Sequence, residues 1–157
     1  MVLKSIQAGR DDLEAINSLM RRSKAYWGYD EAFMSKFMQL FQMTSDYLEK
    51  NQVRLFCEAD GSQYNMSIGF YSFSLNAESD YELDNFFIDP GYIGKGFGKK
   101  MWYHVVDDLK VCGAKKFVLW SDPGAEDFYK KMGCTKIGVK ESPMMPDRYP
   151  VIFEYTI

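Results

Sequence analysis

The sequence has few of the residues that would indicate an extracellular or metal-binding protein. It contains three cysteines, which are odd in number and far apart, and one histidine, His104. There is no C-x-x-C pair, so Cys57, Cys112 and Cys134 favour buried thiols in a reducing compartment over disulfides or a zinc site. We therefore expect a cytoplasmic protein that holds no metal.

The sequence also lacks a large excess of charge and a long apolar run. It has 19 basic and 22 acidic residues, and so a formal net charge of −3, which argues against nucleic-acid binding through bulk charge. The N-terminus has no signal-peptide-like apolar segment, and the longest uncharged stretch, residues 62–77, is rich in Ser, Asn and Gln. We expect neither a nucleic-acid nor a membrane partner.

The length and the apolar periodicity predict the fold class. A chain of 157 residues is long enough for one domain with a substantial core, so we expect residues 1–157 to form a single domain. Helical spacing of apolar residues predicts helices over residues 11–24, 30–41, 44–50, 101–112 and 125–132. Runs rich in aromatic and branched residues predict strands over residues 2–6, 52–59, 66–75, 81–88, 116–120, 134–139 and 150–157, with a turn at Asp60–Gly61. This order predicts an α+β sandwich, a mixed central sheet of about seven strands with helices on both faces, in which the apolar run 117–120 is buried.

The most distinctive stretch runs from Tyr81 to Met101. An aromatic strand ends at Asp89-Pro90-Gly91, and a glycine-rich turn then opens a helix. Such a turn leaves unpaired backbone N–H groups at the positive end of the helix dipole, which suits a phosphate. The residues of the turn are Gly94, Lys95, Gly96, Phe97, Gly98 and Lys99.

Three phosphate-binding patterns compete for this turn. A dinucleotide-binding fold requires G-x-G-x-x-G near the start of a domain, whereas this chain has G-x-G-x-G at mid-chain. A P-loop requires Gly-Lys-Ser/Thr, whereas Lys95 is followed by Gly96. The third pattern fits better, because residues 88–98 resemble the acetyl-CoA signature of the GNAT superfamily of N-acetyltransferases. Ile93 departs from that signature, since it stands where Gln or Arg is usual.

A second motif carries the same resemblance. The family has a helix that reads roughly Asn-x-x-Ala-x-x-Phe-Tyr-x-x-x-Gly, which Ala125, Phe128, Tyr129 and Gly133 match, whereas Asp122 replaces the Asn. The resemblance implies that Tyr129 lies near the thioester sulfur and protonates the departing thiolate. It also implies acetyl-CoA as co-substrate, with a binding set of Phe87, Ile88, Ile93, Gly94, Lys95, Gly96, Phe97, Gly98, Lys99 and Asp122.

Two acidic residues are candidates for the catalytic base. Transfer of an acyl group to an amine requires the amine to be neutral, and a carboxylate can take its proton directly or through water. Glu82 matches the position of the glutamate base of some GNAT enzymes, and Asp84 projects from the same face of a regular strand. The sequence leaves open whether Glu82, Asp84 or water is the base.

The acceptor site is predicted from aromatic residues and one cation. Trp27 and Tyr29 lie in an aromatic segment that in this family borders the acceptor pocket, and Arg148 lies in the loop between the last two strands. Together they suggest a small amine that also carries an acidic or planar group.

These observations predict an N-acetyltransferase that moves an acetyl group from acetyl-CoA to a primary amine of a small molecule or peptide. The transfer is expected to be direct, without a metal, in a monomer or homodimer. The alternative is a non-catalytic acyl-CoA-binding module of the same fold. A mononucleotide-binding domain fits less well, because the turn lacks the P-loop lysine context.

Overall fold

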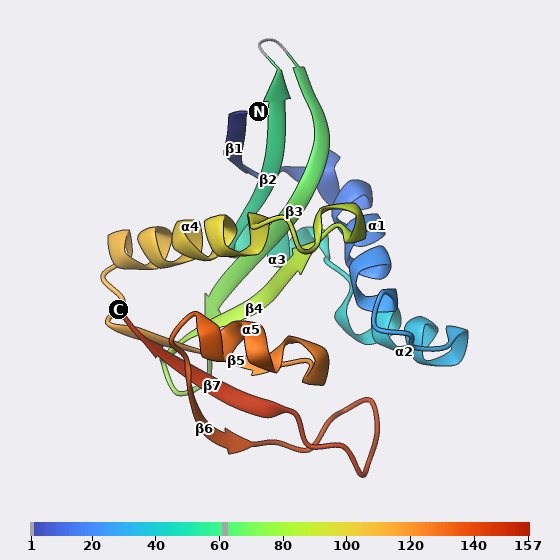
Figure 1. The fold of residues 1–157 in the computed structure, drawn as a ribbon, viewed down its shortest axis with the longest axis vertical. Coiled ribbons are helices and arrows are strands. Elements are labelled where there is room, and N and C mark those ends of the chain that lie inside the picture. The colour runs from blue at the N-terminus through green and yellow to red at the C-terminus, as the bar shows by residue number, and fades with distance from the viewer. Residues whose placement is uncertain (1, 61–62) are drawn as a thin grey trace. The chain divides into compact units, whose positions relative to one another are not determined.

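The computed structural model describes residues 2–60 and 63–157, which form the helices and strands seen in Figure 1. The strands are β1 (Val2–Gln7), β2 (Gln52–Asp60), β3 (Gln63–Leu75), β4 (Tyr81–Ile88), β5 (Lys116–Ser121), β6 (Thr135–Val139) and β7 (Val151–Thr156). The α-helices are α1 (Leu13–Ala25), α2 (Glu31–Phe41), α3 (Ser45–Lys50), α4 (Phe97–Val111) and α5 (Glu126–Lys131). Three short 3-10 turns are η1 (Arg10–Asp12), η2 (Pro90–Tyr92) and η3 (Pro123–Ala125). Gly61 of the predicted Asp60–Gly61 turn lies outside the described residues.

The strands form one seven-stranded sheet in the order β1-β2-β3-β4-β5-β7-β6. β4 and β5 are parallel, whereas β1 with β2, β5 with β7, and β6 with β7 are antiparallel. The sheet is therefore mixed, and the predicted α+β fold with about seven strands is confirmed.

The contacts divide the chain into two compact units. The first comprises residues 1–72 and 85–101, and the second comprises residues 73–84 and 102–157. The expectation of a single domain over residues 1–157 stays a prediction.

The first unit is built on the apolar faces of its helices. In α1 these are Ile16, Leu19 and Met20, which are fully buried. The helix starts follow ordinary capping chemistry: Asp30 Oδ1 accepts from Phe33 N at 2.8 Å, and Thr44 Oγ1 accepts from Tyr47 N at 3.1 Å. The helices predicted over residues 30–41 and 44–50 begin at these two caps.

The second unit is built around an aromatic cluster. Trp102 of α4 is fully buried, and four rings surround it with centroids 5.3–6.3 Å away. These rings belong to Phe117, Phe128, Tyr129 and Tyr155. Aromatic pairs at such distances add to the stabilisation from burial.

Two predictions about burial are wrong. Phe117 and Leu119 are buried as expected, but Trp120 is 38% exposed because alternate side chains of a strand point to opposite faces. The three cysteines are free thiols, of which Cys112 is exposed because it follows the end of α4.

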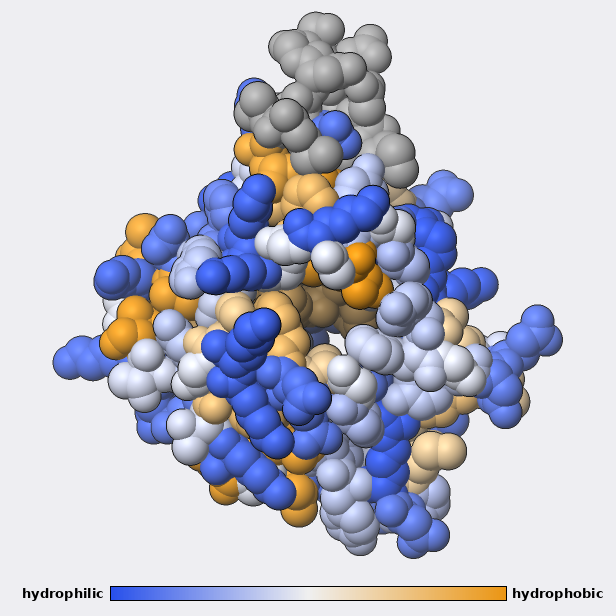
Figure 2. Space-filling model, viewed as in Figure 1, coloured by the Kyte–Doolittle hydropathy of each residue, from blue (hydrophilic) through white to orange (hydrophobic). Residues whose placement is uncertain are grey.

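Large apolar side chains are exposed on several elements. On the face shown in Figure 2, hydrophilic residues predominate and hydrophobic residues form separate small patches. Scattered exposure of this kind is ordinary for folded proteins. Within the described residues, no helix combines the length and the apolar character that a membrane span requires.

One glycine of β3 is required by packing, and we predict that replacing it destabilises the first unit. A Cβ at Gly69 would lie 2.6 Å from the Phe87 carbonyl oxygen and 3.0 Å from Met101 Sδ. Gly69→Ala should lower the free energy of unfolding by about 1–3 kcal/mol, as overpacking does. Gly138→Ala is the control, since a Cβ there meets nothing within 4 Å. Equal denaturant midpoints for the two variants would contradict the prediction.

Candidate functional site

The glycine turn lies in the first unit, between η2 and α4. Gly94 and Gly96 have φ values of 80° and 84°, in the left-handed region that favours glycine. A Cβ at either position would meet nothing within 4 Å. The backbone conformation, rather than a lack of space within the protein, therefore requires glycine at both positions.

The turn presents backbone N–H groups at the start of α4. Lys100 N donates to Gly96 O at 3.4 Å, so the N–H groups of Phe97, Gly98 and Lys99 precede the first hydrogen bond of the helix. Phe97 is buried and its ring meets that of Tyr92 at 5.4 Å, which anchors the turn. An anion placed here would meet both the N–H groups and the positive end of the helix dipole.

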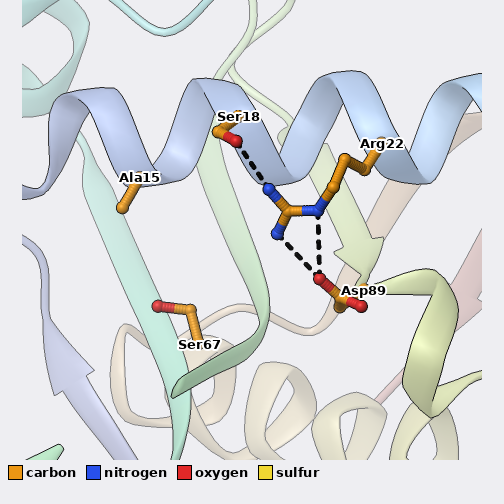
Figure 3. Close-up of a pocket in the computed structure, with 5 residues that line it drawn as sticks. All are labelled: Ala15, Ser18, Arg22, Ser67 and Asp89. Carbon is orange, nitrogen blue, oxygen red and sulfur yellow. Dashed lines mark hydrogen bonds and ion pairs between the residues drawn. The ribbon is translucent and has the colours of Figure 1, made fainter. Parts of the chain in front are cut away.

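An ion pair that the sequence analysis missed holds the start of the turn. Asp89 Oδ1 accepts from Gly91 N at 2.9 Å, while Asp89 Oδ2 accepts from Arg22 Nε at 3.2 Å and Nη2 at 2.7 Å. Arg22 also donates to Ser18 Oγ at 2.5 Å (Figure 3). A cavity of about 290 Å³ lies beside this pair, lined by Ala15, Ser18, Arg22, Ser67 and Asp89. The signal in the sequence that could have indicated this contact is the group of cations Arg21, Arg22 and Lys24 at the end of the predicted first helix.

A row of aromatic rings connects a predicted acceptor residue to a predicted cofactor residue within the first unit. Tyr29 stacks on Phe33 with ring centroids 3.9 Å apart, Phe33 lies 6.5 Å from Phe37, and Phe37 lies 6.5 Å from Phe87 of β4. The Lys24 ammonium lies 5.0–5.9 Å from the rings of Tyr29, Phe33 and Phe37. Trp27 instead meets Tyr26 edge-on at 5.2 Å and is 43% exposed.

The two candidate bases lie in the second unit, on one face of β4. Asp84 Oδ2 accepts from Ser74 Oγ at 2.6 Å. Burial raises the pKa of Glu82 from its ordinary value of 4.5 to about 7, and the hydrogen bond and negative charge of Asp84 add to the effect. A hydrogen bond from Asn76 and the charge of Lys140 act in the opposite direction. A pKa near neutrality suits a general base.

Tyr129 lies on α5 among aromatic rings. It is 7% exposed, and the rings of Phe128, Trp102 and Phe153 lie 5.3–6.0 Å away. Burial, followed by the charges of Cys134 and Asp122, raises the pKa of the Tyr129 hydroxyl far above its ordinary value. The hydroxyl therefore stays protonated at neutral pH and is able to donate a proton or a hydrogen bond.

Cys134 is buried beside the same helix, and burial raises the pKa of its thiol to about 12. The nucleophilic form of cysteine is the thiolate, so this residue is a poor candidate for a covalent catalyst.

The structure brings Asp122 and Arg148 together. Asp122 Oδ1 accepts from Gly124 N at 2.9 Å and so caps η3, while its Oδ2 lies 3.6 Å from Arg148 Nη2. The two side chains are only 13% and 20% exposed. The guanidinium that the sequence assigns to an acidic acceptor thus has a carboxylate of the protein beside it.

A family model described as the acetyltransferase (GNAT) family matches residues 14–134. The chain belongs to this family. The GNAT match covers both the glycine turn and the α5 helix, on which the sequence resemblance rests, and it confirms that resemblance.

Among curated relatives, an uncharacterized N-acetyltransferase of Methanocaldococcus jannaschii is 26% identical over 134 residues. This match covers 79% of the present chain but 57% of the archaeal protein, so the chain spans little more than half of that relative's length.

Solved GNAT structures share the fold. The PaiA N-acetyltransferase of Thermoplasma acidophilum, in complex with coenzyme A, has a TM-score of 0.78 and 19% identity over 100% of both chains. The Salmonella typhimurium protein yncA, with its cofactor acetyl-CoA, has a TM-score of 0.71 and 15% identity over 99% of this chain and 94% of its own. At these identities the likeness establishes the fold.

The raised pKa of Glu82 predicts a dependence of stability on pH. The Glu82 carboxyl keeps its proton up to about pH 7 in the folded protein but releases it near pH 4.5 in the unfolded chain. Protonation of Glu82 therefore stabilises the fold below about pH 4.5, and this stabilisation is lost as pH rises to about 7. As pH rises from about 4.5 to about 7, the free energy of unfolding should decrease, by at most about 1.4 kcal/mol per pH unit before solvent screening is counted. Glu82→Gln should remove this decrease in urea titrations, whereas Glu78→Gln, an exposed acid before the same strand, should retain it. Parallel curves for wild type and Glu82→Gln would contradict the prediction.

Proposed function

We propose that this chain is an acetyl-CoA-dependent N-acetyltransferase that acts on a primary amine of a small molecule or peptide. The observation that carries the proposal is the glycine turn, whose left-handed Gly94 and Gly96 present the first N–H groups of α4. Coenzyme A carries a pyrophosphate, which is the kind of anion that such a helix start binds. The coenzyme A of the Thermoplasma structure and the acetyl-CoA of the Salmonella structure support the same ligand for this chain.

The cofactor-binding residues divide by the contact they can make. The turn supplies N–H groups, and the exposed ammonium groups of Lys95 and Lys99 add positive charge. Ile93 is 36% exposed and its N–H donates to Pro90 O at 3.4 Å, so the N–H groups at the start of α4 carry the recognition of the anion. We assign to the backbone N–H groups near Phe87 and Ile88 the stabilisation of the tetrahedral oxyanion.

Two side chains handle the protons of the reaction. An ammonium acceptor gives one proton to Glu82, and the neutral nitrogen attacks the thioester carbonyl carbon. The C–N bond forms, the C–S bond breaks, and the thiolate takes a proton from the neutral Tyr129 hydroxyl, which regains one from the nitrogen. The products are the acetylated amine and free coenzyme A, while the first proton passes from Glu82 to water. No covalent enzyme intermediate and no metal are needed.

The ligand is tested with matched glycine variants at the two ends of α4. Gly96→Ala should weaken acetyl-CoA binding at least tenfold, because a methyl group and an altered backbone disturb the N–H groups. Gly113→Ala is the control, since Gly113 has the same φ of 84° and open space around its Cβ position, but lies at the other end of the helix. Calorimetry should show acetyl-CoA binding to wild type and to the control. Heat with ATP or NAD and none with acetyl-CoA would contradict the assignment.

Catalysis is tested by removing single hydroxyl groups from the aromatic cluster. Tyr129→Phe should lower turnover by about ten- to a thousandfold, the range for losing one acid or one donor, with little change in the acetyl-CoA dissociation constant. Tyr155→Phe removes a hydroxyl from the same cluster and should leave turnover nearly unchanged. The assay is thiol release with a panel of free amines and peptide N-termini.

The same assay separates the enzyme from a binding module. If wild type binds acetyl-CoA but no amine releases thiol, the chain is a non-catalytic acyl-CoA-binding module. Unaltered turnover in Tyr129→Phe would assign Tyr129 a purely structural role.

A further inference from the structure

Four polar side chains gather at the junction of β3 and β4 within the second unit. Ser74 lies near the end of β3, Asn76 begins the connection, and Glu82 and Asp84 follow on β4. Residues two apart on a strand share a face, and here the carboxyl groups of Glu82 and Asp84 are hydrogen-bonded to each other. Two carboxyl groups in contact hold a proton between them, because two adjacent negative charges repel.

The turn fixes the orientation of the Asn76 amide. Its Oδ1 accepts from Glu78 N and Asp80 N, each at 3.0 Å, and its backbone N–H donates to Asp80 O at 2.8 Å. With the oxygen committed to these two donors, the amide nitrogen is the atom that remains to contact Glu82, and Asn76 does bond to Glu82. Asn76 is therefore a donor to Glu82, held in place by its own turn.

Asp84 is an acceptor from both of its polar neighbours. Ser74 donates to its Oδ2 at 2.6 Å, a length typical of a hydroxyl bound to a carboxylate. The other bond comes from Glu82, whose carboxyl donates when it is protonated. The charged groups that face Glu82 are Asp84 on β4 and Lys140 after β6, and the Lys140 ammonium lies 4.7 Å from the Trp120 ring centroid.

We propose that Glu82 and Asp84 act as one proton-sharing pair, that Ser74 is a positioning residue that assigns the shared proton to Glu82 by donating to Asp84, and that Asn76 is a positioning residue that donates to Glu82 and so limits how firmly Glu82 holds that proton. The pair carries one negative charge when it holds the proton and two when it does not. It therefore attracts an ammonium acceptor in either state, and in the doubly charged state Glu82 accepts the proton that the ammonium must lose. This catalytic consequence rests on the proposed function, whereas the pair itself does not.

The pair is tested by carbon-13 NMR titration of the side-chain carboxyl groups. In wild type, the Glu82 signal should titrate near pH 7. Asp84→Asn removes the neighbouring charge and should lower the Glu82 midpoint by about one pH unit or more. A Glu82 midpoint that does not move in Asp84→Asn would overturn the pair.

The role of Asn76 is tested with a substitution that keeps the turn. Asn76→Asp retains the oxygen that accepts from Glu78 N and Asp80 N, but replaces the donor to Glu82 with an acceptor. The Glu82 midpoint should rise. Ala77→Asp adds the same charge to the next, exposed position and should move the midpoint much less. Equal midpoints in these two variants would overturn the positioning role of Asn76.

The role of Ser74 is tested without touching the turn. Ser74→Ala removes the donor to Asp84, so Glu82 should hold a smaller share of the shared proton and the Glu82 signal should carry less of the change with pH. Ser74→Thr retains a hydroxyl and should restore the wild-type division. If Ser74→Ala leaves that division unaltered, Ser74 has no positioning role.

The titrations need no acetyl transfer, so they separate this proposal from the proposed function. If acetyl transfer is found, the acid limb of kcat/KM against pH should move in the same direction as the Glu82 midpoint in each variant. An acid limb that stays in place while the midpoint moves would overturn the catalytic role of the pair and leave the chain an acetyltransferase with another base.

Discussion

The carboxylate of Asp89 fixes the place at which β4 ends and the glycine turn begins. One oxygen caps η2 through Gly91 N, and the other is held by the Arg22 guanidinium of α1. The backbone must then pass through left-handed conformations at Gly94 and Gly96 before α4 can start. Because a carboxylate with two committed oxygens has little freedom, Asp89 fixes where the turn begins, and the buried ring of Phe97 anchors its other end.

Local patterns in the sequence were sufficient for most of the fold. The bounds of β4 match the prediction, and the predicted helix starts at residues 30 and 44 coincide with caps, whose side chain and N–H lie within three residues of each other. The contacts that the prediction missed join distant residues or depend on a loop conformation. Arg22 and Asp89 are 67 positions apart, and the orientation of Asn76 requires a turn in which Ser79 has a φ of 63°. The periodicity of apolar residues carries no information about a contact between distant residues or about the conformation of a turn.

Burial has opposite chemical consequences for the titratable groups of the second unit. It raises the pKa of Glu82 to about 7, which makes this acid able to take and release a proton near neutrality. It raises the pKa of Cys134 to about 12 and that of the Tyr129 hydroxyl far above its usual range, which keeps both groups protonated. One proton acceptor, one neutral phenol and an unreactive thiol favour direct attack by an amine over a covalent cysteine intermediate.

A half-buried ion pair accounts for Asp122 in this chain, where the GNAT motif has Asn. An amide at that position would cap η3 as well as the carboxylate does, so the cap alone does not require an acid. A carboxylate that is only 13% exposed, however, needs a compensating cation, and Arg148 from the connection between β6 and β7 supplies one at 3.6 Å. An Asn at position 122 would leave the guanidinium, which is only 20% exposed, without this carboxylate. The two residues therefore depend on each other, and the connection that carries Arg148 is tied to the start of the α5 motif.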